Sequence, residues 1–326
     1  MPSVSVFGAA GFAGAIAARL LHRHPQFELS SLTARGDDVG RRLQDVYPQH
    51  RVPLVLEELD LDRHAAVDAA IVAYPHGASA PVVAALRERG ARVVDLSADF
   101  RLDDRSTYEA WYGKHGAPEL FGTGVYGLPE RHRDEIAAAD LVANPGCYPT
   151  ASLIGLGPLR GRATDIVIDA KSGVSGAGRK AAASTHFVSA DENVTPYNVT
   201  GHRHRPEIEQ ELGQPVTFVA HQLPLDQGEL ISAYVTLAEP LEQDELVALY
   251  RSAYAEERFV ELADRPPGVR EVRETNLCRV HVQADPARSK AFVFASIDNL
   301  WKGAASQAVQ NLNLMFGFDE GMALEL

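Results

Sequence analysis

Cys147 lies in a turn-forming segment that leads into an apolar stretch, Asn144-Pro145-Gly146-Cys147-Tyr148-Pro149-Thr150. Asn-Pro-Gly marks a turn, and Pro149 suits the first turn of a helix. A thiol next to a helix N-terminus has a lowered pKa, because the positive end of the helix dipole stabilises the thiolate. This placement predicts a nucleophilic cysteine. The alternative is a buried cysteine that packs as a small hydrophobic residue, and we assign that role to Cys278, within the strand-like segment 277–283.

A nucleophilic thiol needs a base, and the segment Gly201-His202-Arg203-His204-Arg205-Pro206-Glu207 offers two histidines. We expect a histidine of this segment to act as general base for Cys147, with Glu207 orienting its ring. A surface loop at the start of a helix is a compatible alternative. The two histidines could also bind zinc, but no third ligand follows at a convincing spacing, so we expect no metal site.

A glycine-rich turn near the N-terminus is suited to a dinucleotide. It directly follows the apolar segment 3–7 and opens a helical segment, 12–21. Glycines there let the backbone approach a pyrophosphate, and the helix N-terminus adds N–H groups and positive charge. The alternative is a tight strand–helix turn without a ligand. The expected cofactor-binding residues of this turn are Gly8, Ala10, Gly11, Phe12, Ala13 and Gly14.

The end of the next predicted strand carries no acid, although an NAD site usually places Asp or Glu there for the ribose hydroxyls. It reads Leu29-Ser30-Ser31-Leu32-Thr33-Ala34-Arg35. A hydroxyl and an arginine suit a 2′-phosphate, so Thr33 and Arg35 favour NADP as the cofactor. The alternative for Arg35 is an ordinary solvated loop charge.

A second glycine-rich segment, Lys171–Lys180, contains serines and is flanked by cations. It could hold an anionic group of a substrate, or it could be a flexible surface loop. It lacks the spacing of a serine-hydrolase elbow or of a Walker loop.

The elements around these residues indicate two domains. Short apolar segments alternate with helical ones up to residue 146, which predicts a Rossmann-type, doubly wound parallel sheet. From 147 to 299 β-rich segments predominate, which predicts an α+β domain on a largely antiparallel sheet. A helix over 300–316 follows, capped by Asp298 or Asn299. The segments expected to be strands are 3–7, 27–32, 69–74, 92–96, 140–143, 165–170, 216–220, 231–237, 279–283 and 291–297.

Composition narrows the possible functions. The 326 residues leave room for about two domains, and 45% hydrophobic residues are ordinary for a folded chain. A net charge of −13 without a basic run argues against binding to nucleic acid or to a membrane. Two cysteines fit a reducing cytoplasm rather than a disulfide scaffold. The uncharged N-terminal segment is too rich in glycine for a signal peptide or a membrane span.

Taken together, the motifs resemble the N-acetyl-gamma-glutamyl-phosphate reductase family, an arginine-pathway relative of aspartate-semialdehyde dehydrogenase. The resemblance covers nearly the whole chain. The motifs that carry it are Gly8–Gly14, Val94–Arg101, Tyr126–Glu130, Asn144–Thr150, Lys171–Gly178, His202–Glu207 and Asp298–Gly303 with Gln307 and Asn311.

The resemblance implies NADPH-dependent reduction of N-acetyl-L-glutamyl 5-phosphate to the 5-semialdehyde, with release of phosphate, through a cysteine thioacyl intermediate. It implies that Cys147 is the nucleophile and that His202 is the acid/base residue, with Glu207 behind it. In protonated form His202 would stabilise the thiolate. We assign further residues to the cofactor, Ser175, Gly176 and Asn299, and to the substrate, Arg101, Asn144, Lys171, Ser172 and His204. The tail helix is expected to pack on the cofactor domain, and the enzyme is expected to be a cytoplasmic homo-oligomer, dimer or tetramer.

One position departs from the family pattern. Before the segment 229–237, family members often carry Met-x-Arg-Gly, whereas this chain has Leu225-Asp226-Gln227-Gly228. If that arginine holds the substrate carboxylate, Gln227 cannot replace its charge. The cations that could compensate are Arg203, Arg205 and Lys171.

Three other functions remain open. The first is reduction of an aminoadipyl phosphate in lysine synthesis, and the second is aspartate-semialdehyde dehydrogenase activity, against which the motif His202–Glu207 argues. The third is a non-catalytic NADP sensor, against which the presence of Cys147 and His202 argues.

Overall fold

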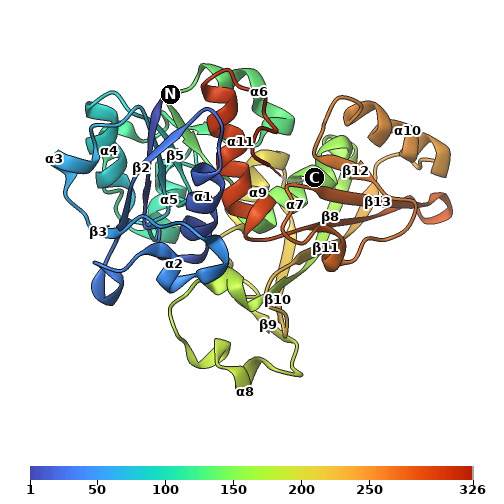
Figure 1. Ribbon diagram of the computed structural model, residues 1–326. Coiled ribbons are helices and arrows are strands. Elements are labelled where there is room, and N and C mark those ends of the chain that lie inside the picture. The colour runs from blue at the N-terminus through green and yellow to red at the C-terminus, as the bar shows by residue number, and fades with distance from the viewer. Residues whose placement is uncertain (325–326) are drawn as a thin grey trace. The chain divides into compact units, whose positions relative to one another are not determined.

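The computed structural model describes residues 1–324, and the chain forms two compact units. Of the described residues, the first unit contains Met1–Gly146 and 304–324, and the second contains Cys147–Gly303. Figure 1 shows the helices and strands of both units.

The first unit is built on a parallel sheet. The strand order is β3-β2-β1-β4-β5-β7-β6, and every neighbouring pair runs parallel. This order starts from β1 and builds outward in both directions, as in dinucleotide-binding folds. The predicted doubly wound sheet is therefore confirmed. The strands are β1 Ser3–Phe7, β2 Glu28–Ala34, β3 Leu56–Glu58, β4 Ala69–Val72, β5 Arg92–Asp95, β6 Val125–Tyr126 and β7 Leu141–Ala143.

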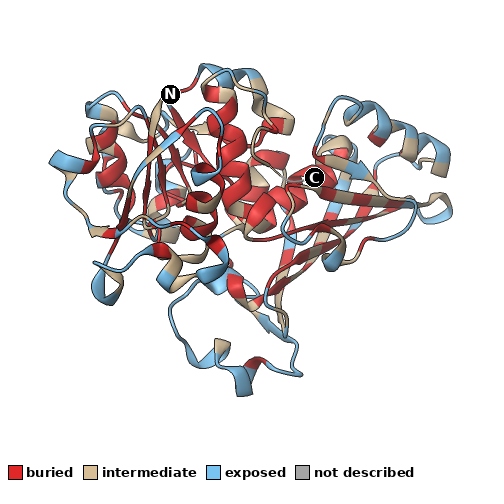
Figure 2. Ribbon diagram, in the orientation of Figure 1, coloured by how far each residue is buried: buried red, intermediate tan, exposed pale blue. Residues whose placement is uncertain are grey.

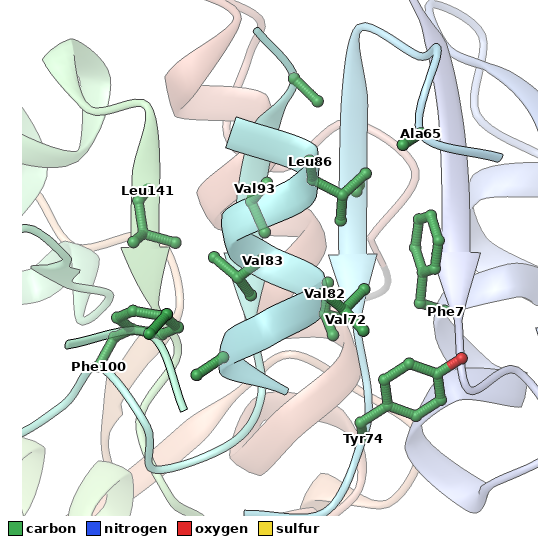
Figure 3. Packing of buried hydrophobic residues seen from close by; sticks show 14 of the residues in the cluster. Phe7, Ala65, Val72, Tyr74, Val82, Val83, Leu86, Val93, Phe100 and Leu141 are labelled. Carbon is green, nitrogen blue, oxygen red and sulfur yellow. The ribbon is translucent and has the colours of Figure 1, made fainter. Parts of the chain in front are cut away.

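Helices pack against this sheet. Figure 3 shows α4 in front of the strands, where Val82, Val83 and Leu86 meet Phe7 and Val93 in one apolar cluster. α11 packs against α1, α6 and β5. The helices of the unit are α1 Phe12–His22, α2 Leu43–Val46, α3 Leu61–His64, α4 Ala80–Glu88, α5 Arg105–Tyr112, α6 Pro129–Ala138 and α11 Ser306–Met315.

Polar side chains of α11 are used inside the first unit. The side-chain amide of Asn311 donates hydrogen bonds to the Gly127 carbonyl at 2.9 Å and to Asn144 Oδ1 at 3.0 Å. Asn313 Oδ1 lies 2.9 Å from His24 Nε2 on the segment that follows α1. These buried bonds join α11 to the rest of the first unit, and they account for much of the polar face of this helix. Ahead of α11, a π-helical turn spans Trp301–Ala305.

The second unit contains a mixed sheet with the order β12-β13-β14-β11-β8-β10-β9. β8 and β10 are parallel, as are β12 and β13, and the other pairs are antiparallel. The prediction of a largely antiparallel α+β unit is confirmed. The strands are β8 Ala163–Gly173, β9 Thr195–Tyr197, β10 Thr217–Leu223, β11 Glu229–Leu237, β12 Val260–Leu262, β13 Cys278–Asp285 and β14 Lys290–Ile297.

The helix α7 covers one face of this second sheet, against β11, β13 and β14. A Cβ on Gly155 would lie 3.2 Å from Ile231 Cδ1, so the helix and the sheet are in close contact there. Figure 2 shows α7 as almost entirely buried, whereas the excursion around α8 is largely exposed. The helices are α7 Cys147–Leu156, α8 Phe187–Ala190, α9 Arg205–Leu212 and α10 Gln243–Ala253.

Candidate active site

The predicted dinucleotide turn has a backbone conformation that requires glycine at positions 8 and 14. Gly8 has φ +87°, and a Cβ there would lie 2.6 Å from the Ala73 carbonyl oxygen. A Cβ on Gly14 would lie 2.4 Å from the Gly8 carbonyl oxygen, so α1 can start this close to β1 only without a side chain. A Cβ on Gly11 would make only an ordinary contact, at 3.5 Å. Contacts within the turn therefore do not require a glycine at position 11, whereas a closely bound ligand would.

The first turn of α1 begins at Phe12 and carries no acidic residue. The first N–H groups of a helix have no acceptor within the helix, and the dipole favours an anion at this end. The turn is fixed from the other side by β2, since the Thr33 carbonyl accepts the N–H groups of Gly8 and Ala9 at 3.1 and 2.8 Å. These features fit a bound pyrophosphate beside residues Ala10 to Ala13.

Thr33 and Arg35 occupy different surroundings. The Thr33 side chain is buried, and its hydroxyl oxygen lies 3.2 Å from the Gly8 nitrogen and 3.0 Å from the Tyr74 hydroxyl. Arg35 is exposed, and its guanidinium carbon lies 4.8 Å from the centroid of the Tyr74 ring. Thr33 therefore supports the turn, while stacking on Tyr74 holds a cation at the carboxyl end of β2.

Two other predicted substrate residues lie in the first unit. Arg101 is buried, and its guanidinium donates hydrogen bonds to the carbonyl oxygens of Asn144 and Leu96, at 2.8 and 2.7 Å. Asn144 is also buried, and its side-chain amide donates to the Ala304 carbonyl at 3.2 Å. Both side chains thus hold the backbone just ahead of Cys147.

Cys147 is the first residue of α7 in the second unit. Its side chain is partly exposed, whereas Cys278 is fully buried in β13, as expected for a packing residue. The π-helical turn passes beside the thiol, since a Cβ on Gly303 would lie only 2.8 Å from Cys147 Cβ. The predicted nucleophile therefore lies at a helix N-terminus and against a glycine.

His202 lies in an aromatic cluster next to the cysteine. Its ring centroid is 5.4 Å from those of Tyr148 and Tyr197, 5.1 Å from that of His204 and 5.0 Å from that of Phe218. Since Tyr148 follows Cys147 directly, the cluster brings the predicted acid/base residue to the N-terminus of α7. Glu207 is buried in the first turn of α9, five residues further along the chain.

The protonation state of His202 differs from our expectation. Burial lowers the pKa of His202 to about 4, so the ring is neutral at pH 7 rather than the imidazolium that we expected from the sequence. Its Nδ1 accepts the backbone N–H of His204 at 3.1 Å, which places the proton of the neutral ring on Nε2. His202 is thus set up to donate a hydrogen bond through Nε2.

Residues of the glycine-rich segment Lys171–Lys180 lie close to Asn299. Asn299 Nδ2 donates to Ser175 Oγ at 3.0 Å, and the Gly228 N–H donates to Asn299 Oδ1 at 2.7 Å. A Cβ on Gly176 would lie 3.3 Å from Ser172 Oγ and 3.7 Å from Asn299 Nδ2. Four residues that we assigned to cofactor or substrate are therefore neighbours. Asp298, rather than Asn299, caps the following turn, because its Oδ1 accepts the N–H groups of Leu300 and Trp301.

Lys171 is the predicted residue that the fold separates from this group. It pairs with Leu230 in β11, so its side chain leaves the sheet on the face opposite Ile231 and α7. There its ammonium lies 2.7 Å from Asp169 Oδ2 and 3.2 Å from Ser232 Oγ.

Glu229 is a site residue that sequence reasoning missed. It is fully buried at the start of β11, directly opposite Ser172 in the neighbouring strand, and its carboxyl interacts with the Cys147 side chain. Burial raises the pKa of Glu229 to about 8. The available signal was the strand period, because Glu229 falls on the same face as Ile231, Ala233 and Val235, all of them buried.

Sequence reasoning also missed Arg273, a cation beside the segment 225–228, where this chain departs from the family pattern. Gln227 is buried, and its carbonyl oxygen accepts a hydrogen bond from Arg273 Nη2 at 3.2 Å. The chain therefore places one guanidinium beside the loop in which the family pattern led us to expect an arginine.

Within residues 1–324, no helix has the length and apolar character needed to cross a lipid bilayer. The same residues contain no group of three or more His, Cys, Asp or Glu side chains arranged to hold a metal ion.

Family models match both units. The model described as "Semialdehyde dehydrogenase, NAD binding domain" matches residues 3–139, and "Semialdehyde dehydrogenase, dimerisation domain" matches residues 147–299. Among solved structures, aspartate semialdehyde dehydrogenase II of Vibrio cholerae has a TM-score of 0.74 at 20% identity, over 97% of this chain and 98% of that one. This likeness shows a shared fold.

Curated relatives match over their full length. N-acetyl-gamma-glutamyl-phosphate reductase of Moorella thermoacetica is 46% identical, over 100% of this chain and 99% of the relative. The enzyme of the same name from Rubrobacter xylanophilus is 46% identical, over 99% and 98% of the two chains. The one from Geobacillus thermodenitrificans is 42% identical, over 97% and 96%. The chain is therefore an oxidoreductase that belongs to the N-acetyl-gamma-glutamyl-phosphate reductase family, within the semialdehyde dehydrogenases.

Proposed function

We propose that the chain catalyses the NADPH-dependent reduction of N-acetyl-L-glutamyl 5-phosphate to N-acetyl-L-glutamate 5-semialdehyde and phosphate, in arginine synthesis. The observation that carries this proposal is the position of Cys147 at the N-terminus of α7, where the ring of the next residue, Tyr148, contacts His202, in a chain similar to these reductases throughout its length.

NADP fits the first unit. The turn from Gly8 to Gly14 would hold the pyrophosphate, and Arg35 would meet the 2′-phosphate from its stacked position on Tyr74. Ser175, Gly176 and Asn299 are proposed to contact the same cofactor from the second unit. A semialdehyde dehydrogenase of Candida albicans with the same fold was solved with NADP, at 15% identity and a TM-score of 0.73.

The first chemical step belongs to Cys147. Its thiolate, stabilised by the dipole of α7, attacks the carbonyl carbon of the acyl phosphate. The bond from that carbon to the phosphate oxygen breaks, phosphate leaves, and a thioester remains on the sulfur. The thioester matters because it accepts a hydride far more readily than a free carboxylate does.

The second step forms and releases the aldehyde. The nicotinamide, when bound, supplies the hydride that reduces the thioester. Negative charge then develops on the former carbonyl oxygen, and the Nε2–H of His202 is proposed to donate a hydrogen bond to it. When the carbon–sulfur bond breaks, the aldehyde leaves and the thiolate of Cys147 is restored. Glu207 is proposed to keep the histidine loop in place from the first turn of α9.

Substrate recognition is proposed for Arg101, Asn144, Lys171, Ser172 and His204. Two of the cations considered above already have acidic neighbours, since Lys171 has an ion pair with Asp169 and Arg205 lies 3.8 Å from Glu209. Arg273 is therefore added to the cations that could bind a substrate carboxylate. The position of Gln227 keeps a longer aminoadipyl substrate as the alternative.

A comparison of phosphate-dependent NADP reduction with N-acetylglutamate, aspartate and aminoadipate semialdehydes tests the choice. Greater kcat/KM with either of the last two would refute the proposed substrate.

A homo-oligomer is proposed from the second sheet. The face opposite α7 carries partly exposed aromatic side chains, among them Tyr234, Phe292 and Phe294, with the rings of Tyr234 and Phe292 6.0 Å apart. A second copy would cover these apolar groups, consistent with the dimerisation domain that matches this unit. Light scattering of the purified chain tests this proposal, as does a Tyr234→Glu variant, which should shift the assembly toward the monomer. A cytoplasmic location is also proposed, and the two cysteines form no disulfide.

A further inference from the structure

Tyr197 is an aromatic residue that the steps above do not use, although its ring lies against that of His202. It is the last residue of β9, a three-residue strand at the edge of the second sheet. The other two residues of this strand, Thr195 and Pro196, are exposed, whereas Tyr197 is partly buried. The burial of this one side chain in an otherwise exposed strand calls for an explanation.

Strand register directs Tyr197 toward the histidine. Tyr197 pairs with Ala220 of β10, and paired residues of neighbouring strands leave the sheet on the same face. Ala220 pairs in turn with Ala170, and Ala170 pairs with Ile231, the residue that lies against α7. Phe218 lies two residues before Ala220, so its side chain is on this face as well. Tyr197 therefore lies on the side of the sheet that α7 covers.

Two contacts connect Tyr197 with the candidate site. Its hydroxyl lies 3.0 Å from the hydroxyl of Tyr148, the residue that follows Cys147, and its ring centroid lies 5.4 Å from that of His202. Tyr148 and Phe218 contact the same imidazole, with centroids 5.4 and 5.0 Å away. Rings from α7, β9 and β10 thus surround His202 and exclude water from it. Burial of this kind is what lowers the pKa of His202 to about 4.

The three rings differ in how firmly the fold fixes them. Tyr148 and Phe218 are only 2% and 3% exposed, and they belong to α7 and to β10, which has a neighbouring strand on each side. Tyr197 belongs to the edge strand, and it follows an excursion of the chain in which Phe187 and Val188 are exposed. Its position therefore depends on the bond between the two tyrosine hydroxyls more than on the sheet.

This hydroxyl bond persists at any working pH. Burial raises the pKa of Tyr148 and of Tyr197 above the usual range of a tyrosine, so both hydroxyls stay protonated and one donates to the other. His204 is the remaining titratable ring beside His202, with centroids 5.1 Å apart.

We propose that Tyr197 is a positioning residue for His202: its hydroxyl anchors the excursion of residues 178–201 to Tyr148, and its ring covers the imidazole. The proposal rests on the acid/base role proposed for His202. Because Tyr148 directly follows Cys147, the same bond keeps the histidine next to the start of α7. An imidazole enclosed in this way stays neutral and keeps one orientation, which a donor to a developing oxyanion requires.

The test measures the pKa of His202 by NMR titration of its imidazole resonances, which are assigned by their loss in His202→Gln. Neither substrate nor cofactor is needed, so the result is independent of whether the proposed reductase activity is found. Tyr197→Ala removes the ring and the hydroxyl and admits water, so it should raise the pKa of His202 by about one unit or more. Tyr197→Phe keeps the ring and should cause less than about half of that rise. Val199→Ala, an exposed residue of the same excursion, is the matched control and should leave this pKa unchanged.

Three results would overturn the proposal. An unchanged pKa in Tyr197→Ala would show that the ring does not keep water from His202. A rise in Tyr197→Phe as large as that in Tyr197→Ala would show that the ring itself covers nothing. A comparable rise in Val199→Ala would show that any change in the excursion has the same effect. Thermal unfolding checks that each variant is folded. If Tyr197→Ala does not fold, Tyr197→Leu takes its place, and an unchanged pKa in that variant would count equally against the proposal.

Discussion

The backbone N–H of His204 donates a hydrogen bond to Nδ1 of His202 at 3.1 Å. This bond distinguishes two histidines that spacing alone could not separate, because it fixes the ring of His202 and its tautomer. His202 presents an N–H through Nε2, whereas His204 contributes its backbone to the arrangement. Both rings lie against Tyr148, with centroids 5.4 and 5.8 Å from that of the tyrosine.

We expect His202→Ala to lower kcat by about 10²-fold or more, the range usual for loss of a general acid–base residue. His204→Ala keeps the backbone N–H and should mainly raise KM. Steady-state kinetics of both variants across pH provide the measurement. A large loss of kcat in His204→Ala, with His202→Ala close to the parent enzyme, would reverse the assignment.

We propose that cofactor choice depends on Arg35, the cation stacked on Tyr74. Arg35→Ala should weaken NADP binding by about ten-fold or more, as expected for loss of a hydrogen bond to a charged group. NAD lacks the 2′-phosphate, so its dissociation constant should change little. Fluorescence titration with both cofactors measures the two effects, and an equal loss for both would show that Arg35 does not bind the 2′-phosphate.

The glycines of the turn offer a matched pair of variants. Gly14→Ala places a Cβ 2.4 Å from the Gly8 carbonyl, so we expect a loss of about 1–3 kcal/mol in the free energy of unfolding. Gly11→Ala makes only a 3.5 Å contact and should unfold close to the parent's midpoint, while it crowds the pyrophosphate and weakens NADP binding. Thermal unfolding and cofactor titration separate the two effects. Unchanged NADP affinity in Gly11→Ala would argue against a pyrophosphate at this turn.

Much of the framework could be predicted because most strands of the first unit contain two or more apolar residues that the fold buries. β1 and its turn into α1 follow from Val4, Val6 and the glycines, and every one of the ten predicted strands has a counterpart. The short strands β3, β6, β9 and β12 were missed, since each has only two or three residues and its pairing depends on distant partners. α10 was also missed, although Glu242 and Glu245 form a capping box at its start.

The chemistry of the site was harder to predict than its location. The position of Cys147 at the start of a helix was predicted because turn residues and helix starts are local signals. The neutral state of His202 depends on rings from α7, β9 and β10, and the burial of Glu229 depends on α7 covering one face of β11. Lys171 illustrates the same point, because strand register alone directs it to the opposite face from Ile231.

The buried carboxyl of Glu229 also predicts how stability depends on pH. Its pKa is about 8 in the folded chain against an ordinary value of 4.5, so the folded state binds a proton that the unfolded state has released. The wild-type chain should therefore lose stability as pH rises from about 4.5 to about 8, by up to about 1.4 kcal/mol per pH unit. Glu229→Gln removes this titration.

The difference between the two proteins should be smallest near pH 4.5 and grow in favour of Glu229→Gln up to about pH 8. Urea unfolding of both proteins at several pH values measures this difference. A Glu229→Gln protein whose advantage is the same at every pH would show that the carboxyl titrates normally in the folded chain.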